Sequence, residues 1–428
     1  MQPRKWFRRG TWKLFQYLPE KIRYRIIRRS FPVSHELTPG LEFKIAETQD
    51  ELETAYNLVY EEYLSSGLTE ANEAGMRMSK FHALPGTTVI IGKIDGEIIC
   101  TLSVIHDGPI GLPMDYTWDL DPIRFKAARI AEISSMAIKR NAQGRRGGIL
   151  LPLCKFMYQF CTEYAGVEII VMSTINIVRD FYSAILLFET LGDAKPKSHG
   201  YTKGVTAYAQ FLDCRTAPER YRRVYDHLED KFNLYKFFKN TDSSKHFIFP
   251  SKVPAQCVYP VMTPDLLNYF FNKSLPIFNS LKPEERDYIR TTYYDQAYLN
   301  VLGSAQETFT HSRRDKRYPV HCNAILTQPG SNVIQKVVVL EIAKNGLGLR
   351  LSEPIPIGKI TKIALDWPNS KKIHIEAIPR WKSPELSYGF QIAQVAYDDW
   401  KAIIDRLEAT FQAKDPGKAL RLKKIMGR

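Results

Sequence analysis

Apolar residues recur at helical spacing near the start of the chain and in continuous strand-like runs soon after. Between residues 50 and 65 they stand three or four positions apart, which predicts an amphipathic helix with an apolar face of Leu52, Ala55, Tyr56, Val59, Tyr60 and Tyr63. Residues 88–94 and 97–106 are apolar runs separated by Asp95-Gly96. An Asp-Gly pair between two such runs is a strong short-range signal for a β-hairpin.

The chain continues to residue 212 as an alternation of strands and helices. Further strands are predicted at residues 43–48, 129–139, 167–173 and 205–212, and further helices at residues 149–164 and 176–189. This order is typical of a mixed sheet flanked by helices, so we expect an α+β fold. The glycines between residues 143 and 148 do not form a GxGxxG motif, which argues against a dinucleotide-binding fold.

The second half of the chain changes character twice. Residues 217–303 are mostly helical by pattern, for example at residues 263–275 and 282–298. After a polar stretch, a small antiparallel β-barrel is predicted from short strands at residues 318–327, 335–343, 346–351, 360–367, 372–381 and 388–395, with a helix from Tyr397. We therefore divide the chain into a basic amphipathic segment 1–40, a sheet domain 41–215, a helical extension 216–302, a linker 303–312, a barrel domain 313–412 and a basic tail 413–428.

The composition of the 428 residues is that of a globular protein, with 44% hydrophobic and 25% charged residues. The six cysteines form no CxxC pair and none lies at zinc-ligand spacing from a histidine, so we expect no metal site. Scattered single thiols favour a reducing compartment. We recognise no signal peptide and no apolar run of membrane-spanning length, so a cytoplasmic protein is expected.

The net charge of +14 is concentrated in part at the N-terminus. Residues 1–30 contain ten basic residues against one acid, Glu20, and aromatic and aliphatic residues lie between them. Such a mixture is typical of a helix that lies on an anionic membrane, so we expect peripheral membrane contact as one interpretation. A flexible solvated tail is an equal alternative, and docking of an acidic protein is another. The many aliphatic residues argue against a nucleic-acid arm.

A glycine-rich turn precedes the predicted helix at residues 149–164. Backbone N–H groups exposed at a helix start favour phosphate, and arginines add positive charge here. The candidate phosphate-binding turn consists of Gln143, Gly144, Arg145, Arg146, Gly147 and Gly148. Many turns of this kind bind nothing, which is the alternative interpretation.

Two side chains are candidates for proton transfer. Glu132 lies among apolar residues of a predicted strand, and burial would raise its pKa and suit it to act as a general base toward an amine. The alternative is a glutamate that faces solvent or pairs with Arg129. Tyr182, in the following helix, would protonate a thiolate leaving group, or else be an ordinary core tyrosine.

These residues occur within runs that resemble the GNAT superfamily, and within it the N-acyl amino acid synthase (FeeM-like) branch, akin to acyl-homoserine lactone synthases. The runs are Asp-Gly-Pro-Ile-Gly-Leu-Pro-Met-Asp at 107–115, Leu-Asp-Pro-Ile-Arg at 120–124, Ala-Glu-Ile-Ser-Ser-Met-Ala-Ile at 131–138, Phe-Tyr at 181–182 and Leu-Gly at 191–192. The resemblance covers about residues 40–300 and includes the helical extension as a lid. It implies transfer of a long-chain acyl group from acyl carrier protein to the amino group of an amino acid. The donor would be acyl-phosphopantetheine, bound at the turn 143–148, and no cofactor would take part in catalysis.

The chain departs from this family at two places. Ser135 stands where relatives often have arginine, and the turn at residues 143–148 is not the usual phosphate-binding sequence of the superfamily. An acidic acyl carrier protein would be attracted by the charge of +14, although acyl-CoA remains an alternative donor. Arg124 and Arg129 are candidates to bind the acceptor carboxylate by bidentate contacts, or else to form surface ion pairs with Asp119 or Asp121.

A second resemblance concerns residues 311–410. An Arg-x-x-x-Arg arrangement before the first barrel strand, followed by a Gly-containing motif between the next two strands, is similar to the PilZ domain, whose ligand is cyclic diguanylate. The resemblance implies a binding site made of Arg313, Arg314, Arg317, Glu341, Ala343 and Gly346. Glu341 replaces the usual Asp or Asn, and Ala343 replaces a serine. Without the second motif, the arginines alone would be interpreted as a basic linker.

The sequence therefore predicts an N-acyltransferase that is regulated by cyclic diguanylate through a C-terminal barrel. The alternative is a catalytically degenerate adaptor that binds acyl carrier protein or a membrane and responds to the dinucleotide. A third interpretation, nucleic-acid binding by the basic ends, is the weakest of the three. The variant Glu132→Gln separates the first two, because only an enzyme loses activity without unfolding.

Overall fold

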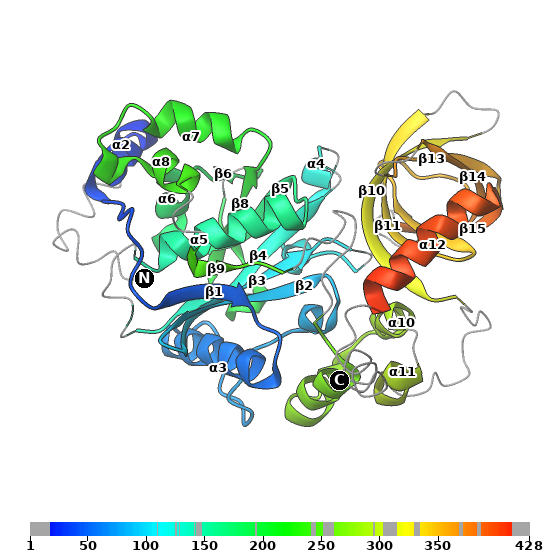
Figure 1. The fold of residues 1–428 in the computed structure, drawn as a ribbon, viewed down its shortest axis with the longest axis horizontal. Helices are drawn as coiled ribbons and strands as arrows, with labels where there is room; N and C mark the ends of the chain where they lie inside the picture. Colours follow the sequence, from blue (N-terminus) through cyan, green and yellow to red (C-terminus); the bar gives the residue numbers. More distant parts are fainter. Residues whose placement is uncertain are drawn as a thin grey trace, which may run out of the picture.

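The computed structural model describes most of the chain and shows two bodies, a large sheet covered by helices and a smaller barrel (Figure 1). The described residues are 18–108, 110–124, 126–127, 129–140, 142, 148–192, 195–240, 245–250, 261–293, 296–302, 315–328, 334–367, 371–382 and 387–412. The predicted linker 303–312, the tail 413–428, residues 143–147 of the glycine turn, and Arg313 and Arg314 lie outside them.

The large sheet is mixed and has the strand order β6-β8-β5-β4-β3-β2-β1-β9, with β7 paired to β8. Its strands are β1 (Leu41–Ile45), β2 (Thr87–Ile94), β3 (Glu97–His106), β4 (Ile130–Ile138), β5 (Ile169–Ile175), β6 (Glu189–Thr190), β7 (Lys197–Ser198), β8 (Thr206–Asp213) and β9 (Phe247–Ile248). The β4–β5 and β1–β9 pairs are parallel, and the other pairs are antiparallel. The predicted α+β, GNAT-like order of elements is confirmed.

The predicted hairpin is formed by β2 and β3 around Asp95 and Gly96, whose φ angles are 50° and 86°. Positive φ at both central residues is the geometry of a type I′ turn, which matches the twist of the two strands. The helix predicted at residues 50–65 is α3 (Gln49–Ser65), and it begins with a capping box between Thr48 and Glu51.

Helices cover both faces of the large sheet, and each face has its own apolar core. One face packs against α2 (Glu20–Ser30), α5 (Leu150–Gln159) with its π-helical continuation η4 (Phe160–Tyr164), α6 (Asn176–Ala184), α7 (Ala217–Tyr225) and α8 (Leu234–Lys239). The other packs against α3, α9 (Pro264–Asn268), α10 (Pro283–Thr292) and α11 (Gln296–Leu302). The short helices are α4 (Asp121–Arg124), η2 (Lys80–Ala83), η3 (Pro113–Tyr116), η5 (Gly200–Thr202), η6 (Asp230–Phe232), η8 (Tyr269–Ser274) and η9 (Ile277–Ser280).

The helical extension predicted at residues 216–302 is not a single unit. Its first part, α7, α8 and β9, packs on the α5 side, and β9 adds a strand to the sheet beside β1. Its second part, α9 to α11, packs beside α3, where Tyr269 Oη donates to Glu53 Oε2 at 2.8 Å and Tyr293 Oη donates to the Ala83 carbonyl at 2.7 Å. Strand pairing of β9 with β1 thus places Phe247 and Ile248 in the sheet, beyond the predicted domain boundary at residue 216.

The C-terminal body is a closed antiparallel barrel with the order β10-β11-β12-β15-β14-β13. Its strands are β10 (Arg317–Thr327), β11 (Ile334–Ala343), β12 (Gly346–Arg350), β13 (Thr361–Leu365), β14 (Ile373–Lys382) and β15 (Ser387–Val395). Helix α12 (Tyr397–Gln412) places Trp400, Ile403 and Leu407 in the barrel's apolar core. The predicted six-stranded barrel with its following helix is confirmed.

Two general properties complete the description. Five cysteines, Cys100, Cys154, Cys161, Cys214 and Cys322, are buried free thiols. In the part of the chain that the structure describes, the helices are all too short or too polar to cross a membrane.

Candidate active site

Glu132 lies in the middle of the large sheet, where two parallel strands part. Strand β4 pairs with β5 through Ile130, Ala131 and Glu132, and the pairing ends there although both strands continue. Only 1% of Glu132 is exposed, and its Oε2 accepts a hydrogen bond from the Met114 N–H at 2.8 Å. The alternative of a solvent-facing glutamate is therefore wrong.

Burial raises the pKa of Glu132 well above its usual range. The Met114 N–H opposes this shift, whereas the negative charges of Asp115 and Asp107 add to it. Met114 is thus the one neighbour among these that favours the carboxylate form. A carboxyl group with a raised pKa is a stronger base once ionised, which suits proton abstraction from an amine.

A cluster of ionic side chains holds the backbone that faces Glu132. Arg124, at the end of α4, donates to both oxygens of Asp107 from Nε (2.8 Å) and Nη2 (3.0 Å). It also donates to both oxygens of Asp115 from Nη1 (2.7 Å) and Nη2 (2.5 Å), and its Nη1 lies 3.4 Å from Asp121 Oδ1. A guanidinium has five N–H groups, and these contacts use all of them. We call Asp107, Asp115 and Arg124 the aspartate–arginine cluster.

This arrangement corrects the acceptor-binding role predicted for Arg124. Its donors are occupied by carboxylates of the chain itself, so it positions the site instead of offering a guanidinium to a substrate. Arg129 lies directly before β4, where its N–H donates to Glu168 Oε2 at 3.1 Å. No contact in the described structure tests its predicted role.

The turn η3 presents the Met114 N–H to Glu132. Asp115 Oδ2 accepts from the Leu112 N–H at 2.6 Å, which closes the turn. Gly111 has a φ of +71°, and a Cβ built on it would lie 2.6 Å from Asp115 Oδ2. The Gly-Leu-Pro-Met-Asp run thus has a physical reason, because glycine leaves room for the aspartate that fixes the turn.

Polar side chains gather on the same sheet face as Glu132, within an otherwise apolar core. His82 Nε2 lies 3.2 Å from Ser103 Oγ, and Ser103 is paired with Ser134, two residues beyond Glu132. His199 Nδ1 lies 2.8 Å from Thr117 Oγ1. Burial lowers the pKa of both histidines to about 4, and the positive charge of Arg77 contributes in both cases.

Arg77 was missed by the sequence reasoning, although its electrostatic influence on His82 and His199 places it on this face. Its guanidinium carbon lies 4.5 Å from the centre of the Tyr63 ring. Nothing in the local sequence marks it, because the residues that surround it come from separate segments of the chain.

Strand β4 contains a bulge just beyond Glu132. The pairing with β3 shifts between Thr101 and Ser103, and Ser135 has a φ of +52°. Bulges often lie beside active sites, where they redirect backbone groups and side chains. Ser135 is the position at which the chain departs from its resembled family, and the bulge gives that position a structural role.

Two tyrosines approach Met136 at this bulge from opposite faces of the sheet. Tyr182 is buried in α6, and its hydroxyl donates to Met136 Sδ at 3.4 Å. Tyr63, in α3, receives a hydrogen bond from the Met136 backbone, which lowers its pKa against a larger upward effect of burial. Burial likewise raises the pKa of Tyr182, so its hydroxyl stays protonated. Tyr63 is a second candidate proton donor that the sequence offered only as a helix-face residue.

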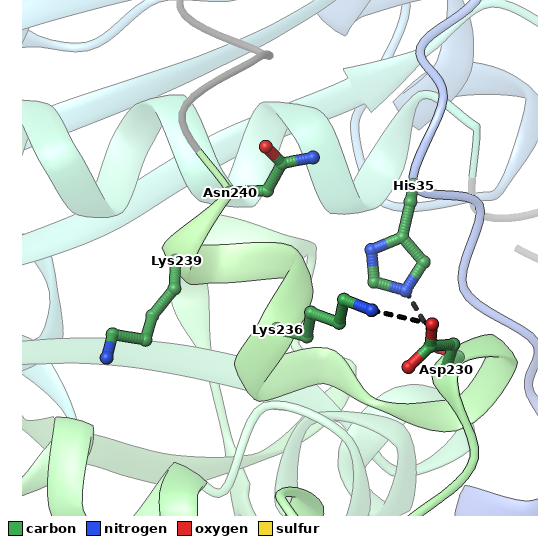
Figure 2. A pocket seen from close by; sticks show the side chains of 5 residues that line it. All are labelled: His35, Asp230, Lys236, Lys239 and Asn240. Carbon is green, nitrogen blue, oxygen red and sulfur yellow. Dashed lines mark hydrogen bonds and ion pairs between the residues drawn. The ribbon is translucent and has the colours of Figure 1, made fainter.

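Two cavities lie away from Glu132. An apolar cavity of about 170 Å³ lies between α5, α7 and α8 and is lined in part by Cys154, Met157, Leu186, Phe188, Tyr221 and Phe238. A polar hollow of about 400 Å³ is lined by His35, Asp230, Lys236, Lys239 and Asn240. Figure 2 shows the His35 ring and the Lys236 ammonium directed at Asp230, with Lys236 Nζ 2.6 Å from Asp230 Oδ2. This hollow is larger, but the residues that line it do not include Glu132 or any residue of β4.

In the barrel, three of the predicted ligand residues lie in one row across neighbouring strands. Arg317 on β10 pairs with Ala343 on β11, which pairs with Gly346 on β12. Glu341 forms an ion pair with the Arg317 guanidinium, and only 4% of its side chain is exposed. A Cβ on Gly348 would lie 2.3 Å from Glu341 Cγ, so the glutamate lies across this glycine.

Part of the chain matches a known protein family. Residues 54–210, from α3 to β8, match the family described as N-acyl amino acid synthase FeeM. This stretch includes Glu132, the aspartate–arginine cluster and Tyr182. Residues 54–210 form an N-acyltransferase domain. The FeeM-type match ends before α7, so it does not extend to α9–α11 or the barrel.

Several solved structures are similar to parts of the chain. The FeeM N-acyl amino acid synthase from uncultured soil microbes is 22% identical, over 42% of this chain and 96% of that chain, with a TM-score of 0.37. The CoA-dependent acyl-homoserine lactone synthase BjaI is 14% identical, over 50% and 95%, with a TM-score of 0.35. The inhibitor of motility MotI/DgrA from Bacillus subtilis is 15% identical, over 24% and 54%, with a TM-score of 0.22. Likenesses at these TM-scores say nothing about substrates. No curated protein matches the chain.

Proposed function

We propose that the N-acyltransferase domain moves a long-chain acyl group from a phosphopantetheine thioester to the amino group of an amino acid, with Glu132 as general base. The observation that carries the proposal is the position of Glu132. It is a buried carboxyl with a raised pKa, and it lies where β4 and β5 stop pairing. Partly separated parallel strands offer a place for an extended thioester arm to reach the carboxyl.

The reaction needs two proton transfers. The amine nitrogen attacks the thioester carbonyl, a C–N bond forms, and Glu132 accepts the proton from nitrogen. The C–S bond then breaks, and the thiolate takes a proton from the Tyr182 hydroxyl. Glu132 returns its proton through solvent to Tyr182, so the products are an amide and a free thiol.

The acceptor carboxylate is assigned to Arg77, with Arg129 as the other candidate. Arg77 influences His82 and His199 on the face of the sheet that also carries Glu132, whereas Arg124 has no N–H group left. An arginine can bind a carboxylate through two parallel, charge-assisted hydrogen bonds, which suits Arg77 to this role. In the variant Arg77→Met we expect the KM for the amino acid to rise more than kcat falls.

Acyl carrier protein is the proposed donor, with acyl-CoA as the alternative. The charge of +14 favours an acidic protein over a neutral one. Gly148, directly before α5, is the part of the predicted donor turn that the structure describes. The apolar cavity between α5, α7 and α8 suits the far end of an acyl chain.

The proposal is tested with purified full-length protein and with lipid extracts. Wild type and Glu132→Gln are assayed with acyl carrier protein and CoA thioesters of the same acyl length against a panel of amino acids. We expect wild type to form N-acyl amino acids, detected by mass spectrometry, and Glu132→Gln to lose activity by about 10²–10⁴-fold while remaining folded. Full activity in Glu132→Gln would overturn the role of Glu132. Inactivity of a folded wild type with every donor would favour the adaptor alternative.

We further propose that the barrel binds cyclic diguanylate in the manner of a PilZ domain. The row Arg317–Ala343–Gly346 supports this, because Arg317 of the first motif lies beside two residues of the second. The dinucleotide must compete with Glu341 for Arg317, so we expect weak binding by wild type. Calorimetry should show tighter binding by Glu341→Asp with Ala343→Ser, by about 3- to 10-fold for one recovered hydrogen bond, and none by Arg317→Ala.

Peripheral membrane contact is proposed for the N-terminal segment. In α2, Arg23 is tied to Asp180 at 2.7 Å, and Arg28 Nε donates to the Ala184 carbonyl at 2.8 Å. Lys21, Arg25 and Arg29 remain exposed on the opposite side of the same helix. Flotation with phosphatidylserine vesicles should carry the wild type upward, and less of the variant in which these three residues are replaced by glutamine.

A further inference from the structure

The barrel reaches the transferase site through Arg350, the last residue of β12. Arg350 Nη1 forms an ion pair with Asp107 Oδ2, and its Nη2 donates to the Gly108 carbonyl at 2.7 Å. Leu349 lies in the barrel core, so the next side chain leaves the barrel on its outer face. Only 6% of the Arg350 side chain is exposed. It lies between the sheet body and the barrel, which are side by side in Figure 1.

A continuous path of contacts joins Arg350 to Glu132. Asp107 is shared between Arg350 and Arg124, and Arg124 in turn holds Asp115. Asp115 closes the turn η3, whose Met114 N–H donates to Glu132. In addition, the Asp107 N–H donates to the Ile130 carbonyl of β4 at 3.0 Å.

Arg350 also balances the charge of this buried group. Asp107 and Asp115 are negative, while Arg124 and Arg350 are positive, so the four charges cancel. Without Arg350, one negative charge would remain uncompensated beside Glu132. Buried charges without partners act strongly on their neighbours because little water screens them.

We propose that Arg350 is a positioning residue of the transferase, and that the barrel thereby completes the active site by supplying the charge and the contact that hold Asp107 in place. This inference rests on the proposed role of Glu132. It assigns the barrel a part in the acyl-transfer reaction itself, whether or not the barrel binds a nucleotide.

The consequence is a pH dependence that differs between variants. The groups around Glu132 are Asp107 after β3, Asp115 in η3, Arg124 in α4, Arg350 on β12, and Arg77, His82 and His199 on the same sheet face. The two histidines are neutral near pH 7, because burial lowers the pKa of each to about 4. Loss of Arg350 leaves Asp107 and Asp115 acting on Glu132 in excess, so ionisation of Glu132 requires a higher pH.

The test compares the pH profiles of full-length variants. In Arg350→Met we expect the rising limb of kcat/KM against pH to move upward by about one unit, with the high-pH plateau retained, so that activity falls by up to about tenfold at pH values on the limb. Arg350→Lys keeps the charge and should rescue most of the shift. The double variant Asp107→Asn with Arg350→Met removes both charges, so its limb should return toward that of wild type.

Controls separate this inference from the proposed function. Arg380 is an exposed barrel arginine whose Nε donates to Gln391 Oε1 at 2.9 Å, and Arg380→Met should leave the profile unchanged. Inactive Glu132→Gln together with an unmoved limb in folded Arg350→Met would overturn the role of Arg350 and leave the function standing. Equal loss at every pH would also overturn it, because a merely structural role predicts that result. Fully active Glu132→Gln would instead overturn the proposed function.

Discussion

At the scale of single residues, the protonation of Glu132 is governed by burial, because the groups that touch it only partly offset the loss of water. The Met114 N–H favours the charged form, but Asp107 and Asp115 disfavour it. A group whose folded pKa is raised binds its proton more tightly in the folded state than in the unfolded one. The folded state is then favoured at low pH, and this contribution disappears as the pH rises through the raised pKa.

This sign gives a stability prediction. Glu132→Gln removes the titration, so its free energy of unfolding should exceed that of wild type increasingly as the pH rises above about 4.3, the ordinary glutamate value. Each unit of pKa shift corresponds to about 1.4 kcal/mol. Urea unfolding at pH 5 and pH 8 measures the difference. A gap between the two proteins that stays constant with pH would contradict the raised pKa.

The two tyrosines at Met136 allow a second prediction at this scale. Tyr182→Phe should lower kcat by about 10- to 100-fold with little change in KM, because only the proton donated to the leaving thiolate is lost. Tyr63→Phe tests the other candidate donor, since the Tyr63 hydroxyl meets the backbone of the same residue from the other face. If Tyr63→Phe lost the rate and Tyr182→Phe kept it, the donor would be Tyr63.

At the scale of elements, the site depends on short irregular pieces more than on the long strands. The turn η3 presents one N–H to Glu132, and the bulge at Ser135 redirects β4 just beyond it. Both pieces need unusual backbone angles. The aspartate–arginine cluster holds η3 in place, because Asp115 closes the turn and also accepts hydrogen bonds from Arg124.

Gly111 tests the role of η3. In Gly111→Ala, the alanine would have to adopt a positive φ, and its Cβ would lie 2.6 Å from Asp115 Oδ2. The substitution should therefore destabilise the protein and displace the turn. Gly67 has nearly the same φ, +72°, but nothing lies within 4 Å of its Cβ position, so Gly67→Ala carries the backbone cost alone, about 1–2 kcal/mol. We expect thermal denaturation to show a larger loss for Gly111→Ala and assays to show lost activity in that variant only.

At the scale of the whole molecule, two bodies with separate cores meet at a buried ion pair. Arg350 and Asp107 are 243 positions apart in the chain, yet they form an ion pair in which both side chains are almost fully buried. Breaking such a pair by removing one partner typically costs about 3–5 kcal/mol, because the other charge stays buried. The barrel is therefore expected to rigidify the loop between β3 and β4.

Hydrogen exchange tests this coupling. In Arg350→Met, peptides covering residues 107–124 and 346–350 should exchange faster than in wild type, while peptides from α5, on the opposite sheet face, should not change. The substitution Arg380→Met provides the reference for an exposed barrel arginine. Unchanged exchange at residues 107–124 would show that the barrel does not hold this loop.

The sequence alone sufficed for features that depend on local pattern. The Asp95-Gly96 turn predicted the β2–β3 hairpin, because few residue pairs adopt positive φ at both positions. The periodic apolar face predicted α3, and evenly spaced strands predicted the barrel. Glu132 could be predicted as a site residue because a carboxyl group is unusual among the apolar residues of a buried strand.

Only the tertiary structure decided how distant segments combine. The strand β9 joined residues 247–248 to the sheet, the three aspartates around Arg124 removed it from substrate binding, and Arg350 crossed from the barrel to Asp107. The β1–β9 pairing and the Arg350–Asp107 ion pair have no periodicity and no short motif, because their partners lie far apart in the chain. The Arg124–Asp121 pair is local, and the sequence offered it as an alternative. A hydrophobic pattern in the sequence indicates which residues near one another in the chain share a face of a helix or strand. A charge network depends instead on three-dimensional distances and on the water that folding excludes.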